Sequence, residues 1–265
     1  MTTYFGRVKK LYQHFEEHRS ISMIRYSILR KRGTMSSLPD LSIIAALIGD
    51  PARATMLSVL MDEIALPASE LAYCAKITPQ TASSHLSKLV KGGLLSVTST
   101  GRHRYYRLSN RDVARALESL ALISPAPRVS SLNESIIKHQ VRHARTCYDH
   151  LAGKLGVGLT QAFIQKGFIE SHEETFEVTA IGEKWFTKQL GINLSQLHRK
   201  RRAFAPACLD WSERKPHIAG TLGAEIATQF FKLKWLVRIR GSRAVRVTES
   251  GQDHLHRELD IIWTS

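Results

Sequence analysis

Two dipeptides in which a helix-capping residue precedes proline divide the first half of the chain into short helices. They are Asp50-Pro51 and Thr78-Pro79. Asp and Thr side chains accept hydrogen bonds from the first N–H groups of a helix, and proline fits the first helical position because its missing N–H costs nothing there. The glycine pair Gly92-Gly93 permits the left-handed conformation that ends a helix. The sequence therefore predicts a helix from Pro79 to about Lys91.

Apolar residues recur at helical spacing in three segments before this helix. They predict a helix from Leu41, a second after Pro51 that buries Met56 and Leu57, and a short third helix that starts near Ala68. The residues between the third helix and the next leave room only for a tight turn. A short helix, a tight turn and a second helix make a helix-turn-helix, whose second helix lies in the major groove of DNA.

The helix after Pro79 has one apolar and one polar face. Ala82, Leu86 and Leu89 are spaced to pack inward, and the other positions carry hydroxyl, amide and amino groups. Glutamine pairs with adenine through two hydrogen bonds, serine and threonine reach several base edges, and lysine reaches phosphate or guanine. Capping and simple solvation are the plainer explanation, and Thr78 is a cap in any case. The predicted DNA contacts of this helix are Thr78, Gln80, Thr81, Ser83, Ser84, His85 and Lys88.

A basic hairpin is predicted directly after this helix. Apolar and polar residues alternate on both sides of a tip at Ser99–Arg104. Alone, such a tip is a solvated turn. Next to a recognition helix it is better interpreted as a wing that touches the phosphate backbone or the minor groove. The predicted wing contacts are Arg102, His103 and Arg104, and an amphipathic helix capped by Ser109 or Asn110 follows.

The order of these motifs over residues 40–123 resembles the ArsR-type winged helix-turn-helix transcriptional regulators. The resemblance is carried by "GDPAR", "SELA", "TPQTASSHLSKL", "GGLL" and "GRHRYYRLS". It implies a homodimer on a double-stranded DNA operator, in which the first and last helices of the module pair and two recognition helices enter successive major grooves. Metal-sensing members carry paired cysteines before the recognition helix or His and carboxylates on the last helix. Here Cys74 stands alone, so we expect no metal ligands there.

Charge and composition support a nucleic-acid partner and set the expected domains. The formal net charge is +15, and a basic protein attracts polyanions because phosphate contacts release counterions. Residues 1–34 hold eight basic and two acidic residues. They are either a flexible basic arm or the result of a translation start assigned too far upstream. A Pro/Ser stretch at Ser124–Ser131 indicates a linker. The expected domains are therefore a basic extension at 1–34, a DNA-binding domain at 35–125 and a sensor or dimerisation domain at 126–265.

The same composition sets the expected location. No apolar run approaches the roughly 20 residues of a membrane span, and the N-terminus has no secretory pattern, so no membrane partner is expected. Three cysteines form no disulfide framework, which favours the reducing cytoplasm.

The second half reads as helices and hairpins. Residues 133–159 are predicted to form one long helix. Two later segments share a pattern of helix, strand, loop, strand, Val-Thr, two residues, Gly and helix, which favours an internal duplication over two unrelated pieces. The expected fold is therefore mainly α with small β-hairpins (α+β), with an N-terminal winged helix-turn-helix and a C-terminal helical domain with winged-helix-like hairpins.

Six residues of the second half are candidate effector or redox groups, and their use stays open. Cys147 and Cys208 make a redox pair if the fold brings them together, with Arg145 or Arg214 promoting the thiolates. A metal site is a second alternative, with Cys147, Cys208, His150, His217 and Asp210 as its ligands. No CxxC or HxxxH spacing among these residues supports it, so none is assigned as a metal ligand and the cofactor is unknown. Trp211 and Tyr148 are candidates to line a small-molecule pocket, and packing alone is the last alternative. The six residues are Cys147, His150, Cys208, Asp210, Trp211 and His217.

The sequence as a whole favours a transcriptional regulator, specifically a homodimeric repressor released by a small-molecule, metal or redox signal. The alternative is a nucleic-acid-binding or nucleoid protein without an effector. An enzyme would use Cys147 or Cys208 as nucleophile with His150 or His217 as base. The sequence has no Gly-rich phosphate loop, nucleophile elbow or metal-hydrolase motif, so no catalytic residue and no enzymatic activity are expected.

Overall fold

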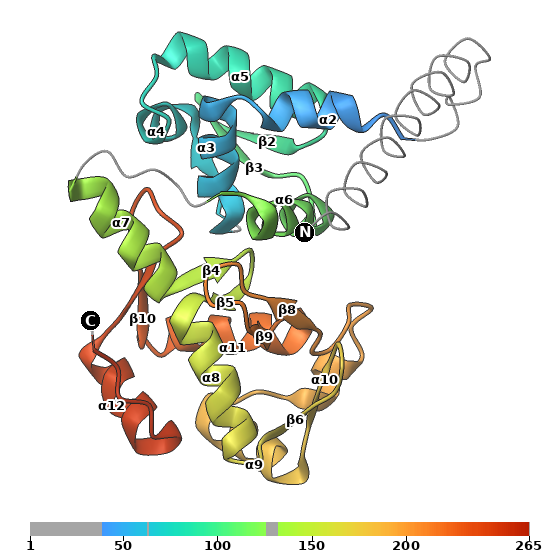
Figure 1. The fold of residues 1–265 in the computed structure, drawn as a ribbon, viewed down its shortest axis with the longest axis vertical. Helices are drawn as coiled ribbons and strands as arrows, with labels where there is room; N and C mark the ends of the chain where they lie inside the picture. The colour runs from blue at the N-terminus through green and yellow to red at the C-terminus, as the bar shows by residue number, and fades with distance from the viewer. Residues whose placement is uncertain (1–38, 63, 126–131, 265) are drawn as a thin grey trace, which may run out of the picture. The chain divides into compact units, whose positions relative to one another are not determined.

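The computed structural model describes residues 39–62, 64–125 and 132–264 (Figure 1). The basic extension at 1–34 lies outside the described residues, as does most of the Ser124–Ser131 stretch. The chain separates into two compact units, one ending at Ala46 and the other starting at Leu47. The boundary expected near residue 125 falls beside undescribed residues, so it stays a prediction.

The helices of the N-terminal module begin and end close to their predicted positions. Asp50 accepts a hydrogen bond from the N–H of Arg53, and Thr78 accepts one from the N–H of Thr81. Gly93, two residues after the helix that ends at Lys91, has a left-handed φ of +74°. The helices are α2 (Leu41–Ile48), α3 (Pro51–Val59), the 3₁₀ helix η1 (Leu60–Asp62), α4 (Ala68–Cys74), α5 (Pro79–Lys91) and α6 (Arg111–Ile123).

Within the described residues no single helix is long and apolar enough to cross a membrane. The bent helix pair Leu41–Ile48 and Pro51–Asp62 passes that test by length and composition.

A three-stranded antiparallel sheet completes the module, in the order β1-β3-β2. Its strands are β1 (Leu66–Pro67), β2 (Leu95–Thr100) and β3 (His103–Leu108). Thr100 pairs with His103, so β2 and β3 are joined by a two-residue turn. The positive φ of +59° at Gly101 suits the tight hairpin turns that match strand twist. The predicted hairpin is confirmed.

The C-terminal region contains the same succession of elements twice, which supports the predicted duplication. After α7 (Leu132–His143), the first repeat consists of β4 (Arg145–Cys147), β5 (His150–Ala152), α8 (Gly153–Gln165), β6 (Ile169–Ser171), β7 (Phe176–Val178) and α9 (Ala180–Leu190). After α10 (Leu194–His198), the second consists of β8 (Ala207–Leu209), β9 (Pro216–Ile218), α11 (Gly220–Lys232), β10 (Leu236–Arg238), β11 (Val245–Val247) and α12 (Glu249–Leu259). Buried residues of both repeats, including Phe163, Phe186 and Phe230, belong to one apolar core.

The prediction of one long helix over 133–159 is wrong. The helix stops at His143, and a two-residue turn at Tyr148 and Asp149 folds the chain into the β4–β5 hairpin. Tyr148 and Gly153 have positive φ angles of +60° and +73°, which interrupt a right-handed helix. The apolar spacing looked continuous because apolar residues recur on both sides of the hairpin, in α7 at Ile136, Ile137 and Val141 and in α8 at Leu155 and Leu159.

Candidate DNA-binding surface and a buried cysteine–histidine cluster

The polar face of α5 is exposed along most of its length. Ala82, Leu86 and Leu89 are fully buried on the opposite face, as their helical spacing requires. In α5 and at its N-cap, the predicted contact residues with exposed side chains are Thr78, Gln80, Thr81, Ser83, Ser84 and Lys88. This helix therefore holds a row of hydrogen-bonding groups away from its core.

Four of the residues predicted to contact DNA also have partners inside the module. One is Ser83, whose hydroxyl donates to the carbonyl of Pro79 at 2.9 Å. His85 is partly buried, and its Nδ1 atom lies 3.2 Å from Arg53 Nη1 and 3.9 Å from Asp50 Oδ1. The Oγ1 atom of Thr78 accepts the N–H of Thr81 and lies 2.9 Å from the Thr81 hydroxyl. These contacts help to hold the start of α5 in place.

The β2–β3 wing lies beside this helix and shares a groove with it. Arg102, His103 and Arg104 are exposed at the tip. Together with Ser83 and Ser87 of α5, they line a hollow of about 520 Å³. Hydroxyl groups on one wall and cationic groups on the other suit a polyanion whose base edges are also exposed.

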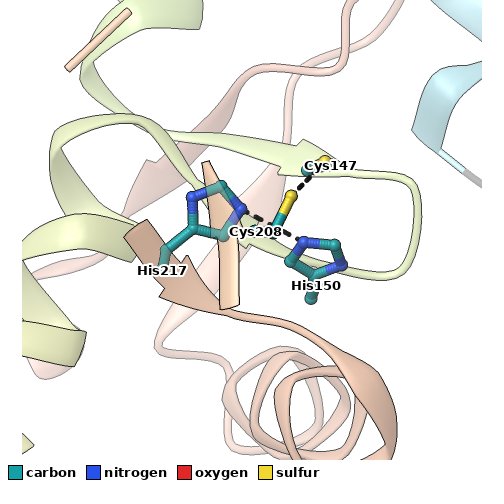
Figure 2. A group of neighbouring side chains, drawn as sticks. All are labelled: Cys147, His150, Cys208 and His217. Carbon is teal, nitrogen blue, oxygen red and sulfur yellow. Dashed lines mark hydrogen bonds between the residues drawn. The ribbon is translucent and has the colours of Figure 1, made fainter. Parts of the chain in front are cut away.

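Two cysteines and two histidines from the two repeats meet in the C-terminal region. Figure 2 shows the side chains of Cys147, His150, Cys208 and His217 converging from the β4–β5 and β8–β9 hairpins. The two sulfur atoms are 4.0 Å apart, and the two Nε2 atoms are 3.1 Å apart. All four candidate ligand atoms lie within 4.8 Å of one another. Both cysteines are free thiols.

The strand register explains why each hairpin contributes one cysteine and one histidine. Cys147 is the cross-strand partner of His150, and Cys208 is the cross-strand partner of His217. Directly opposed residues in an antiparallel pair project their side chains on the same face. Each hairpin therefore presents a Cys–His pair, although two residues separate the pair in the first repeat and eight in the second.

An aspartate faces the other ring nitrogen of each histidine. Asp149 Oδ1 lies 3.2 Å from His150 Nδ1, and Asp210 Oδ2 lies 3.4 Å from His217 Nδ1. The second distance is an ion-pair contact without hydrogen-bond geometry, since His217 Nδ1 has no hydrogen-bond partner. Burial raises the pKa of both carboxyl groups, but hydrogen bonds and nearby arginines outweigh it and hold the pKa values below their usual range.

Each aspartate is held by a different arginine. Arg145 is fully buried, donates to Asp210 Oδ2 at 2.8 Å and lies over the Trp211 ring at 4.4 Å from its centroid. Arg202 makes a two-pronged contact with Asp149. Arg111 of α6 also reaches Asp149, at 3.2 Å. The two histidines are therefore oriented by carboxylates that are themselves fixed.

The six candidate effector or redox residues are not all in one place. Cys147, His150, Cys208 and His217 form the cluster, Asp210 supports it, and Trp211 packs on Arg145 instead. Trp211 lines one hollow of about 490 Å³, and Tyr148 lines two others of about 540 and 460 Å³. A hydrogen bond with Cys208, together with burial, raises the pKa of the Cys147 thiol to about 12. Arg145 is engaged by Asp210 and does not promote a thiolate here.

Sequence reasoning did not place Asp149 and Arg202 at the cluster, and it gave Arg145 another role. It predicted the duplication but left the β4–β5 and β8–β9 hairpins out of the repeat. The signal is the recurrence of Cys-x-Asp and of His, an aliphatic residue, Ala and Gly, in "CYDHLAG" (147–153) and again in "CLDWSERKPHIAG" (208–220). The different loop lengths hide this recurrence from a search at fixed spacing.

The first of these hairpins contacts the N-terminal module directly. The N–H of Tyr148 donates to the carbonyl of Met61 at 2.8 Å, and the hydroxyl of Thr146 donates to Asp62 at 2.5 Å. From the second repeat, Arg243 makes an ion pair with Glu118 of α6. The cluster and the DNA-binding module thus share a buried network of polar contacts.

Known proteins match both the module and the longer chain. A family described as "Helix-turn-helix domain" matches residues 48–98. The uncharacterized HTH-type transcriptional regulator YdfF of Bacillus subtilis (strain 168) is 47% identical over 223 residues, covering 84% of this chain and 98% of the relative.

Solved structures match about a third of the chain. Reduced HlyU from Vibrio cholerae N16961 is 21% identical and covers 32% of this chain and 90% of its own, with a TM-score of 0.30. The cadmium metal-sensor CMTR from Mycobacterium tuberculosis is 29% identical and covers 34% of this chain and 93% of its own, with a TM-score of 0.29. YdfF matches most of this chain, and the helix-turn-helix family matches within its N-terminal half. The chain therefore belongs to the HTH-type transcriptional regulators.

Proposed function

We propose that this regulator is a cytoplasmic, homodimeric repressor that binds a double-stranded DNA operator through α5 and the β2–β3 wing. The observation that carries the proposal is the exposed polar face of α5 beside a wing with two arginines, Arg102 and Arg104. Hydroxyl and amide groups on a helix read base edges, whereas arginines on a wing fix the register through phosphate contacts. The formal net charge of +15 favours the same partner.

The dimer is supported by apolar residues left exposed on the first and last helices of the module. On α2, Leu41 is 76% exposed and Ile43 is 58% exposed. On α6, Ile123 is 81% exposed. Pairing of these two helices across a two-fold axis removes such surfaces from water and places two copies of α5 for successive major grooves, as the ArsR resemblance implies.

The C-terminal region is the proposed sensor. Its β4–β5 hairpin bonds to Met61 and its Arg243 bonds to Glu118, so a change in this region reaches the elements that carry α5. A releasing signal, whether a small molecule, a metal or a redox change, must favour the state that does not fit the operator. The coupling then appears as a lower affinity for DNA when the signal is present.

The test begins with footprinting on DNA upstream of the protein's own gene and its neighbours, followed by binding titrations at several salt concentrations. Gln80→Ala is expected to weaken operator binding by about 1–3 kcal/mol and to relax sequence preference, since it removes a base contact. Lys88→Ala and Arg104→Ala are expected to weaken binding to all sequences and to reduce the salt slope by about one each.

Lys184→Ala is the matched control, because Lys184 is an exposed cation on α9, outside the groove. The docking proposal is wrong if Lys88→Ala and Arg104→Ala leave both affinity and salt slope unchanged. Equal binding to operator and bulk competitor DNA would favour a nucleoid protein instead. Sedimentation at operator-binding concentrations is expected to give twice the mass of one chain.

A further inference from the structure

We propose that Cys147, His150, Cys208 and His217 bind one zinc ion tetrahedrally, with one Cys–His pair supplied by each C-terminal repeat. Two thiolates and two imidazoles are the donor set that zinc takes in structural sites. Four side chains of this kind, from segments 61 and 67 residues apart, meet around one point in Figure 2. This site is separate from the DNA contacts proposed above, and its test measures metal rather than DNA.

The distances fit this ion. Bonds of ~2.3 Å to sulfur and ~2.0 Å to nitrogen in a tetrahedron separate two sulfurs by about 3.8 Å and two nitrogens by about 3.3 Å. The two sulfurs here are 4.0 Å apart and the two Nε2 atoms are 3.1 Å apart. The sulfur–sulfur distance is about twice the ~2.05 Å of a disulfide, so the pair is spaced for a shared ligand rather than a covalent bond.

The surroundings of the histidines are those of metal ligands. Each Nδ1 faces a carboxylate, Asp149 or Asp210, and each Nε2 points into the cluster. Metal-binding histidines donate their second ring N–H to such a carboxylate, which fixes the tautomer and leaves the Nε2 lone pair for the metal. If both histidines are in that tautomer, two lone pairs face each other at 3.1 Å, and a cation between them removes their repulsion.

Burial and access also fit a closed metal site. Cys147, His150 and His217 are buried, and four protein ligands leave no open position, which is typical of structural zinc. A hollow of about 540 Å³ reaches Cys147, His150 and Cys208, and provides a path for the ion. The metal would tie the β4–β5 hairpin to the β8–β9 hairpin, releasing the two thiol protons to solvent as it binds.

The experiment uses the full chain purified under reducing conditions without added metal. Elemental analysis is expected to give one zinc per chain, and thiol titration after denaturation to give three thiols per chain, as the sequence contains three cysteines. Replacement of zinc by Co²⁺ is expected to give the visible bands of tetrahedral cobalt and a thiolate-to-cobalt charge-transfer band. Chelation of the metal is expected to lower the melting temperature, because the ion binds the folded state.

Variants assign the ligands. Cys147→Ser, Cys208→Ser, His150→Gln and His217→Gln are each expected to lose the bound zinc and the zinc-dependent rise in melting temperature. Asp149→Asn, which alters a supporting carboxylate only, is expected to lower zinc affinity about 10–100-fold. Cys74→Ser and His172→Gln are the controls and are expected to keep one zinc, since neither residue belongs to the cluster.

Three outcomes would overturn the proposal. The first is a folded wild-type protein that holds no zinc and gives no cobalt spectrum. The second is a Cys147–Cys208 disulfide or bound iron in the protein as isolated. The third is full zinc retention in folded His150→Gln and His217→Gln. Circular dichroism shows whether each variant is folded. If a variant fails to fold, the zinc content and cobalt spectrum of the wild type still decide the proposal.

Discussion

The two C-terminal repeats place a Cys–His pair on a hairpin in the same way but hold the adjoining aspartate differently. The first hairpin turns in two residues and the second through residues 210–215, yet the Cys–His register is the same. Asp210 of the second repeat is bound inside the fold by Arg145, with both side chains fully buried. Asp149 of the first repeat is bound by Arg202, which is 20% exposed, and by Arg111 of α6.

This difference shows which features the duplicated unit must keep. The hairpin register and the Asp two positions after Cys are the same in both repeats, because they place the four cluster atoms and orient the two histidines. The loop length and the arginine partner differ, because any fixed cation can neutralise the carboxylate. The second repeat uses a buried arginine, and the first uses Arg202 together with Arg111 of α6.

The largest expected effect tests the two arginines against each other. Arg145→Met leaves Asp210 without its buried partner and is expected to lower the free energy of unfolding by about 3–5 kcal/mol. Arg202→Met is expected to cost about 1–2 kcal/mol, because Asp149 keeps its ion pair with Arg111. Urea denaturation followed by circular dichroism measures both. Equal costs would contradict the distinction between a buried and a peripheral ion pair.

A smaller effect tests the equivalence of the repeats at their last helices. A Cβ added to Gly182 would lie 1.9 Å from the Phe168 carbonyl oxygen, and one added to Gly251 would lie 2.3 Å from the Trp235 carbonyl oxygen. Gly182→Ala and Gly251→Ala are each expected to lower the free energy of unfolding by about 1–3 kcal/mol through overpacking. In thermal or urea unfolding, a neutral result at either position would show that the two repeats are packed differently.

The control for this pair is Gly158→Ala on α8, where an added Cβ meets nothing within 4 Å. Alanine is expected to stabilise that helix by about 0.5–1 kcal/mol, since glycine is the poorer helix former.

The smallest effect concerns the two threonine caps of these helices. The Thr179 hydroxyl accepts from the N–H of Gly182 at 3.0 Å and donates to the carbonyl of Gly167 at 2.6 Å. The Thr248 hydroxyl accepts from the N–H of Gly251 at 3.1 Å and donates to the carbonyl of Lys234 at 2.8 Å. Thr179→Ala and Thr248→Ala are each expected to cost about 1 kcal/mol. Serine at either position keeps the hydroxyl and should restore most of the loss, as unfolding titrations of the serine variants will show.

The N-terminal module was predictable from sequence because its signals are local. Asp50, Thr78 and Gly93 each act within four residues of where they stand, and the hairpin follows from the alternation around Gly101. Once the apolar face of a helix is recognised, the 3.6-residue period alone predicts which of its other side chains point to solvent. His85 departs from this pattern, since contacts with Arg53 and Asp50, distant in sequence, turn it partly inward.

The β4–β5 hairpin was mistaken for helix because three-residue strands are too short to show their alternation. Its strands, Arg145–Cys147 and His150–Ala152, are buried on both faces. A short strand that is buried on both faces shows no alternation of exposed polar and buried apolar positions, and here Arg145, Thr146 and His150 are buried with the rest. The apolar runs around it resemble helix spacing. The positive φ at Tyr148 is not encoded by a glycine or asparagine, so the turn had no sequence signal.

By itself the sequence determined the caps, the helix-turn-helix, the polar face of α5 and the repetition of helix and hairpin, because each depends on residues a few positions apart. Only the tertiary structure decided that Cys147 and His150 meet Cys208 and His217, 61 and 67 residues away. Two hairpins converge there because both repeats pack their helices into one apolar core. Contacts between residues that meet through packing in a shared core follow no sequence period or fixed spacing, so the sequence alone does not reveal them.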